Sequence, residues 1–251
     1  MKIVAMDGRA LNPGDLSWRG FEALGEFVCY DRTPPELILP RMREADAVLV
    51  NKTPVTAATL EACPRLRYIG VLATGYNVVD TAAAAARGIP VCNVPDYGTE
   101  AVAQFTFALL LELCHQVGDH SRAVHAGEWS RQPDFSYWNS PQRELAGLTL
   151  GVVGYGRIGR AVGRIGRAFG MEVLAFGPHL EPGPLEGGVT AVPLAELFAA
   201  ADVVSLHCPL TAQNAGMIDG AALAAMKPGV LLLNTARGHY GGITENAVRS
   251  F

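Results

Sequence analysis

A glycine motif is the feature of this sequence that most clearly predicts chemistry. It is Gly-x-Gly-x-x-Gly, formed by Gly154, Gly156 and Gly159. They follow the apolar run 150–153 and precede apolar residues at helical spacing. In such a strand–turn–helix the first glycine permits a tight turn, the second lets a pyrophosphate approach the backbone, and the third lets the helix pack on the sheet. The helix amides beginning near Arg157 would face the phosphates. The motif predicts a dinucleotide site and redox chemistry; the alternative is a glycine-rich turn in an ordinary α/β domain.

The position that usually distinguishes NAD from NADP holds no acid in this sequence. An acidic residue about 20 positions after the glycines usually binds the adenosine ribose hydroxyls. Here Gly177 ends the predicted strand, and Glu172 lies at its opposite end. Gly177 has no carboxylate that could repel the 2′-phosphate of NADP. The sequence also has no arginine beside Gly177 that could attract this phosphate. His179 could contribute, although an exposed loop histidine is the simpler interpretation. We expect NAD as the cofactor and leave NADP open.

Arg237 is the charged residue most suggestive of a substrate site. It follows the predicted strand 229–234, within the run Asn-Thr-Ala-Arg-Gly. The segment 205–211 lies in the same way at the end of the preceding predicted strand, so both segments stand at carboxyl ends of strands. Ligands of open α/β sheets bind at the carboxyl ends of the strands. A guanidinium there can bind a carboxylate through two parallel hydrogen bonds. The sequence therefore favours a carboxylate substrate at Arg237, with a surface salt bridge as the alternative.

Composition excludes several other classes of function. The 251 residues are 49% hydrophobic, with a net charge of −4, so nucleic acid and anionic membranes are poor partners. No apolar run reaches the roughly 18 residues that a membrane-spanning helix needs. The five cysteines are scattered without a CxxC pair, which favours a reduced, cytoplasmic compartment. The six histidines form no HxxxH or HxH pair, so we expect no metal site.

Two series of strands alternate with helices, which predicts two doubly wound parallel-sheet domains of the α/β class. In the first series, strands are expected near 2–7, 26–30, 47–51, 67–73 and 89–94, with helices near 17–24, 35–45, 56–62 and 79–87. In the second, strands are expected near 148–153, 171–176, 189–192, 202–206 and 229–234. A long helix near 99–117, apolar on all sides, is expected to be buried, and 126–146 and 177–184 are expected to be loops. The predicted domains are 1–98 and 99–251.

Several segments of this chain together resemble the D-isomer-specific 2-hydroxyacid dehydrogenases. They occur in the family's order and cover the chain to about residue 238: 72–80 (Leu-Ala-Thr-Gly-Tyr-Asn-Val-Val-Asp), 93–95 with 98–104, the glycine motif, 207–211 and 234–238. The segments 7–18 and 134–138 resemble the bacterial glycerate dehydrogenase (hydroxypyruvate reductase) branch. The resemblance implies a flavodoxin-like substrate domain followed by a Rossmann NAD-binding domain, with a cleft between them.

The resemblance also implies residue roles. Backbone amides at Thr74 and Gly75 would hold the substrate carboxylate, and Arg237 would bind the 2-oxo acid and polarise its carbonyl. Cofactor contacts are implied for a larger set: Thr99 and Val102 (nicotinamide), Gly154, Gly156, Arg157, Ile158 and Gly159 (pyrophosphate), His207, Cys208, Pro209 and Thr211 (adenosine), and Thr235 and Ala236 (nicotinamide riboside). The reaction implied is hydride transfer between NAD(P)(H) and a small 2-oxo or 2-hydroxy acid, such as hydroxypyruvate or glycerate. The family habit also implies a homodimer.

One part of the family pattern is missing from this sequence. The family uses a histidine and a glutamate, both well downstream of the 234–238 motif, as its acid–base pair. His239 lies too close to Arg237 to face it across a substrate, and Glu245 fits the start of a capped helix. We therefore expect an incomplete Rossmann domain and slow or absent turnover. The alternatives are a catalytically impaired fragment, a nucleotide-sensing binding protein on the same fold, or a reductase of glyoxylate, lactate or phosphoglycerate.

Overall fold

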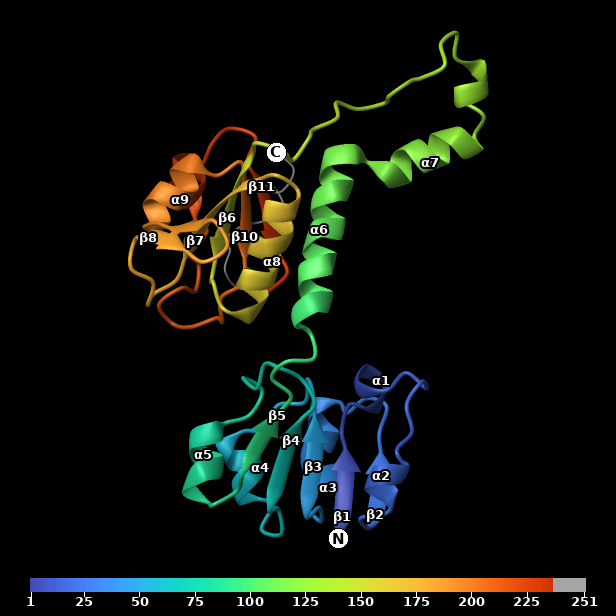
Figure 1. The fold of residues 1–251 in the computed structure, drawn as a ribbon. Helices are drawn as coiled ribbons and strands as arrows, with labels where there is room; N and C mark the ends of the chain where they lie inside the picture. The colour runs from blue at the N-terminus through green and yellow to red at the C-terminus, as the bar shows by residue number, and fades with distance from the viewer. Residues whose placement is uncertain (237–251) are drawn as a thin grey trace. The chain divides into compact units, whose positions relative to one another are not determined.

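The computed structural model describes residues 1–236, which form two compact α/β units (Figure 1). The first is Met1–Gly98 and the second begins at Thr99.

The first unit is built on a five-stranded parallel sheet in the order β2-β1-β3-β4-β5, the flavodoxin-like order. Its strands are β1 (Lys2–Ala5), β2 (Glu26–Cys29), β3 (Ala47–Val50), β4 (Tyr68–Val71) and β5 (Val91–Asn93). Its helices are α1 (Gly8–Leu11), α2 (Arg19–Glu22), the 3-10 turn η1 (Pro35–Leu37), α3 (Ile38–Met42), α4 (Ala57–Glu61) and α5 (Thr81–Ala86). All five predicted strands are present.

Both faces of this sheet are buried, which explains the continuous apolar runs in its central strands. Val48 and Val50 of β3 pack into the larger core, and Ala47 and Leu49 point into a smaller core on the other face. Two of its helices begin at side-chain caps: the Thr56 hydroxyl accepts from the Thr59 amide at the start of α4, and the Asp80 carboxylate accepts from the Ala83 amide at the start of α5. The doubly wound arrangement predicted from the sequence is confirmed for this unit.

The second unit contains a six-stranded sheet in the order β11-β10-β6-β7-β9-β8. Its strands are β6 (Thr149–Val153), β7 (Glu172–Phe176), β8 (Gly183–Leu185), β9 (Val189–Ala191), β10 (Val203–Leu206) and β11 (Leu231–Asn234). Its helices are α6 (Thr99–His115), α7 (Val117–His125), the 3-10 turn η2 (Trp129–Arg131), α8 (Arg157–Ala168), α9 (Leu194–Ala200) and α10 (Gly220–Ala225). The order of the parallel strands matches the predicted Rossmann fold, with the switch in strand order between β6 and β10.

The prediction of a plain loop over 177–184 was wrong at its end. The edge strand β8 pairs antiparallel with β9, which makes this sheet mixed. Gly187 and Gly188 both have positive φ, +77° and +74°, and close the hairpin between the two strands. Paired glycines between short strands are a hairpin signal, because both residues can take left-handed backbone conformations.

The helix predicted near 99–117 is buried along only one side. Its inward residues Ala103, Phe107 and Leu110 pack toward α8, which lies alongside it (Figure 1), whereas Phe105 and Leu113 are exposed. The helix ends at His115, where a residue with positive φ (Gln116, +45°) turns the chain by 57° into α7. α7 was not predicted from the sequence. In residues 1–236 no single helix satisfies the length and hydropathy of a membrane span; only the bent pair α6–α7 does so jointly.

Candidate cofactor and substrate sites

The strand register places four predicted site positions in one row. Val153 of β6 pairs with Phe176 of β7 and with Leu206 of β10, which pairs in turn with Asn234 of β11. The next residue of each strand therefore stands at the same carboxyl edge of the sheet, in the order Gly177, Gly154, His207, Thr235. This is the edge where open α/β sheets bind ligands, and it includes the switch in strand order.

Gly154 is confined by its neighbours on both sides. Its φ of +98° is the tight turn predicted from the sequence, and its amide donates to the Phe176 carbonyl at 2.8 Å. A Cβ on Gly154 would collide with the backbone of the adjacent segment, with Cys208 Cα and His207 C only 2.7 Å away. The glycine is therefore required by the turn and also by the strand end next to it.

The other two glycines of the motif have opposite surroundings. A Cβ on Gly159 would overlap the Gly154 carbonyl oxygen and approach Val152 Cγ1 at 3.1 Å, so the missing side chain lets α8 sit close to β6. Gly156, the N-cap of α8, has no heavy atom within 4 Å of such a Cβ. The space above Gly156 is thus open beside a helix N-terminus, as a pyrophosphate requires. Arg157 and Ile158 form the first turn of α8.

The end of β10 and the segment after it are organised by hydrogen bonds that the sequence did not predict. Ser205 Oγ and His207 Nε2 lie 2.8 Å apart, and burial lowers the pKa of His207 to about 4. His207 is therefore neutral at pH 7. Asn214 Nδ2 donates to the Pro209 carbonyl at 2.8 Å, and the Thr211 amide donates to Asn214 Oδ1 at 2.7 Å. Asn214 thus closes the loop that carries Cys208, Pro209 and Thr211.

A buried hydroxyl connects the two predicted nicotinamide segments. Thr106 Oγ1 donates to the Val102 carbonyl at 2.8 Å and lies 3.2 Å from Thr235 Oγ1. Thr106 is only 1% exposed, and this contact joins α6 to the chain after β11. The fold thereby brings Val102 and Thr235 together across 133 positions of sequence. Thr99 is the first residue of α6, and Ala236 follows Thr235, its amide donating to Asn234 Oδ1.

The predicted substrate loop follows β4 in the first unit. Thr74 Oγ1 donates to the Val94 carbonyl at 3.1 Å, and Asn93 Nδ2 donates to the Thr74 carbonyl at 2.8 Å. These bonds attach the loop to the end of β5. Within residues 1–236, the amides of Thr74, Gly75 and Tyr76 donate no hydrogen bond. Consecutive free amides can bind an anion without a buried charge.

Asp7 fixes the neighbouring loop after β3. Its Oδ2 accepts from the amides of Asn51, Lys52 and Thr53 at 2.8–3.0 Å, and its Oδ1 accepts from the Thr53 hydroxyl at 2.7 Å. Burial opposes ionisation of Asp7, but these hydrogen bonds outweigh that penalty and lower its pKa. The sequence places Asp7 at the end of the first expected strand, near 2–7, but did not predict its partners, which lie 44–46 positions away.

We expect Asp7→Asn to lower the free energy of unfolding by about 1.5–3 kcal/mol at pH 7, since a charged acceptor of four hydrogen bonds becomes neutral. The folded pKa lies below the unfolded value, so this stabilisation is complete above the unfolded pKa and is lost as the pH falls through the folded pKa. Urea unfolding of both proteins should therefore show a difference that shrinks below about pH 4. The exposed Asp15→Asn serves as control; an equal loss there, or a difference independent of pH, would contradict the role of Asp7.

Some predicted residues lie outside the part of the chain that the structure describes. They include Arg237, the predicted catalytic residue, and the two alternatives His239 and Glu245. Among residues 1–236, no group of three or more His, Cys, Asp or Glu side chains is placed to hold a metal ion.

Sequence comparisons give this chain many relatives. The NAD binding domain of the D-isomer specific 2-hydroxyacid dehydrogenases matches residues 107–248. The hydroxypyruvate reductase of Blautia hydrogenotrophica is 49% identical over 241 residues, which are 95% of this chain and 75% of that protein. The glycerate dehydrogenase of Methylorubrum extorquens is 36% identical over 247 residues, 98% of this chain and 74% of that protein.

A solved structure is also similar to this chain over most of its length. The D-lactate dehydrogenase from Aquifex aeolicus, complexed with NAD and lactic acid, superposes with a TM-score of 0.81 at 29% identity, covering 96% of this chain and 71% of that one.

Proposed function

Because this chain belongs to the family of D-isomer-specific 2-hydroxyacid dehydrogenases, we propose that it interconverts hydroxypyruvate and glycerate with a nicotinamide nucleotide. Its family comprises oxidoreductases that transfer a hydride between NAD(P)(H) and a small 2-oxo or 2-hydroxy acid. The choice of acid rests on the two sequence relatives whose names state it, the hydroxypyruvate reductase and the glycerate dehydrogenase.

The cofactor site in this proposal is the carboxyl edge of the second sheet. The single observation that carries it is the row Gly177, Gly154, His207, Thr235, with open space above Gly156 at the start of α8. The first-turn amides of α8 bind the pyrophosphate, and neutral His207 lines the adenosine side without adding charge. Thr106 positions Val102 and Thr235 beside the nicotinamide riboside. Bound NAD(P)H supplies the hydride.

The first unit, in this proposal, is the substrate domain. The free amides at Thr74, Gly75 and Tyr76 hold the carboxylate of the 2-oxo acid, and the bonds to Asn93 and Val94 keep that loop in place. Arg237 binds the same acid and polarises its carbonyl, which favours hydride attack at C2. Because backbone amides hold the substrate carboxylate, the site needs no second cationic side chain beside Arg237.

The proposal is tested by following NADH oxidation with three acids: hydroxypyruvate, glyoxylate and pyruvate. We expect the largest kcat/KM for hydroxypyruvate among the three acids. A larger kcat/KM for glyoxylate or pyruvate would reassign the substrate. Nucleotide binding by calorimetry without turnover of any of the three acids would overturn the reductase and favour the nucleotide-sensing alternative.

We further propose NAD as the cofactor, with NADP also accepted. Gly177 stands where a carboxylate would reject a 2′-phosphate, and a Cβ added there would lie 3.4 Å from Leu180 side-chain atoms and 4.0 Å from the Tyr155 amide nitrogen. A side chain at Gly177 therefore fits with only a small adjustment of Leu180.

Gly177→Asp should weaken NADPH binding roughly tenfold to a hundredfold relative to NADH, because the new carboxylate repels the 2′-phosphate and accepts from the ribose hydroxyls. Dissociation constants for both nucleotides, measured by calorimetry, give this ratio directly. Gly177→Asn has the same size without the charge and should change the ratio little. If the unaltered protein already rejects NADPH as strongly as the aspartate variant does, Gly177 is not the position that sets the preference.

We propose a cytoplasmic homodimer as the working form. Exposed apolar side chains follow one side of α6, with Phe105 at 59% and Leu113 at 52% exposure. The chain then runs into an arm formed by α7 and the segment after it (Figure 1). That arm carries the exposed aromatic residues Trp129, Phe135 and Trp138. These exposed apolar side chains favour burial against a second copy. The mass of the protein in solution tests whether it is a dimer.

A further inference from the structure

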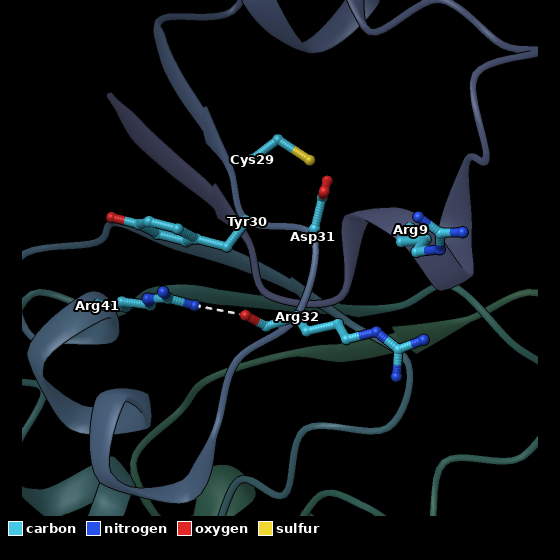
Figure 2. Close-up of a pocket in the computed structure, with 6 residues that line it drawn as sticks. All are labelled: Arg9, Cys29, Tyr30, Asp31, Arg32 and Arg41. Atoms are coloured by element: carbon cyan, nitrogen blue, oxygen red, sulfur yellow. Dashed lines mark hydrogen bonds between the residues drawn. The ribbon is translucent and has the colours of Figure 1, made fainter.

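A shallow cavity of about 750 Å³ lies in the first unit, apart from the loops discussed above. Figure 2 shows its lining at the end of β2: Arg9, Cys29, Tyr30, Asp31, Arg32 and Arg41. Three guanidinium groups and one carboxylate give this lining an excess of positive charge. It stands at the carboxyl edge of the sheet, which is the ligand-binding edge of doubly wound folds. β2 is three strands from β4, roughly 14 Å at the usual strand spacing, so the cavity is separate from the 74–76 loop.

The backbone around the cavity is held rigidly. The Gly8 amide donates to the Tyr30 carbonyl at 2.7 Å, the Arg9 amide donates to the Asp31 carbonyl at 3.2 Å, and the Thr33 hydroxyl donates to the Met6 carbonyl at 2.7 Å. These bonds fix the chain after β2 against α1 and the end of β1. A site that is already ordered loses little entropy when it binds a ligand.

The three arginines differ in what holds them. Arg41 is committed to the protein: its guanidinium lies 3.8 Å from the centre of the Tyr30 ring, and its Nη1 donates to the Arg32 carbonyl and to Thr33 Oγ1, both at 2.8 Å. Arg9 and Arg32 are exposed, and within residues 1–236 neither side chain takes part in an ion pair or hydrogen bond. In Figure 2 both of these guanidinium groups extend to the same side of the 29–32 segment.

The two other polar groups define which ligands fit. The Asp31 carboxylate points toward the Cys29 side of the cavity (Figure 2), and burial together with Asp31 raises the pKa of the Cys29 thiol. Cys29 therefore stays a neutral thiol and adds no negative charge near the arginines. Two guanidinium forks with free donors match the oxygen atoms of a phosphate or a carboxylate.

We propose that Arg9 and Arg32 form a second anion-binding site, which takes a small molecule carrying a phosphate or carboxylate group. Arg41 supports the site electrostatically and fixes its wall through Tyr30. Asp31 limits the affinity because its charge opposes a second anion. This site is independent of the proposed dehydrogenase activity, and neither proposal depends on the other.

The test is a titration of the full chain, with labelled arginine side chains observed by NMR, using inorganic phosphate and malonate as probes. We expect saturable shifts at Arg9 and Arg32 with a dissociation constant on the order of 1–10 mM. Arg9→Gln combined with Arg32→Gln should abolish binding, whereas Arg43→Gln combined with Arg67→Gln removes two exposed arginines of the same unit and should leave it intact. Asp31→Asn should tighten binding several-fold.

Three results would overturn the site. Shifts that rise without saturation, and that sodium chloride of equal ionic strength reproduces, would show only screening of surface charge. Equal loss of binding in the Arg43/Arg67 control would show an effect of net charge alone. Unchanged affinity in Asp31→Asn would place the anion elsewhere. A stronger response to phosphate than to malonate, or the reverse, distinguishes phosphate esters from carboxylates as the natural ligand class. Nucleotide binding measured on the same samples keeps this outcome separate from the cofactor site.

Discussion

Gly154→Ala is expected to lower the free energy of unfolding by about 3–5 kcal/mol. Two effects add. The backbone there has φ of +98°, which a residue with a Cβ rarely adopts, and the new methyl group would press on the backbone of His207 and Cys208. Backbone cannot rotate aside as a side chain can, so β6 and β10 would have to separate at the edge where the cofactor site is proposed. Urea unfolding with tryptophan fluorescence measures the loss.

A matched control separates the two effects. Gly147 also has positive φ (+78°), yet no heavy atom lies within 4 Å of a Cβ built on it. Gly147→Ala should therefore cost only the conformational strain, about 1 kcal/mol. The excess in Gly154→Ala is then the cost of separating the strand ends. If the two variants lose equal stability, the contact with the 207–208 backbone is unimportant.

Gly156→Val is expected to have the opposite signature: binding of NADH weakened a hundredfold or more, with the fold nearly unchanged. Gly156 has φ of −82°, which any residue can adopt, and open space where its side chain would project. In our proposal that space is taken by the pyrophosphate, so the valine side chain displaces it from the first-turn amides of α8. We expect the melting temperature without nucleotide to change by only a few degrees, since replacing an N-cap glycine costs at most about 1 kcal/mol.

The control for Gly156→Val is another glycine in open space at the start of a helix. Gly220 is the first residue of α10, and no heavy atom lies within 4 Å of a Cβ built on it. Gly220→Val should leave the dissociation constant for NADH unchanged. Tight NADH binding by Gly156→Val would mean that the phosphates lie elsewhere, and the assignment of this turn as the cofactor site would fail.

Patterns that repeat within a short stretch of chain were enough to predict most of the fold. The apolar runs 48–50 and 150–153 predicted strands covered on both faces, because burial of a parallel sheet on both sides selects apolar residues at every position. The tight turn at Gly154 and the close packing at Gly159 followed from spacing alone, because each depends on backbone geometry within one strand–turn–helix.

What only the tertiary structure decided involves partners far apart in sequence. Asp7 makes four hydrogen bonds to the loop after β3, and Thr106 contacts Thr235. The cavity that Arg9 and Arg32 line is likewise formed by residues from different elements. The antiparallel edge strand β8 and the bend at Gln116 were missed for a related reason: short elements carry too few residues for a period to emerge. Local propensity fixes which residues form each element, whereas side-chain partners are fixed only once the sheet register brings strand ends together.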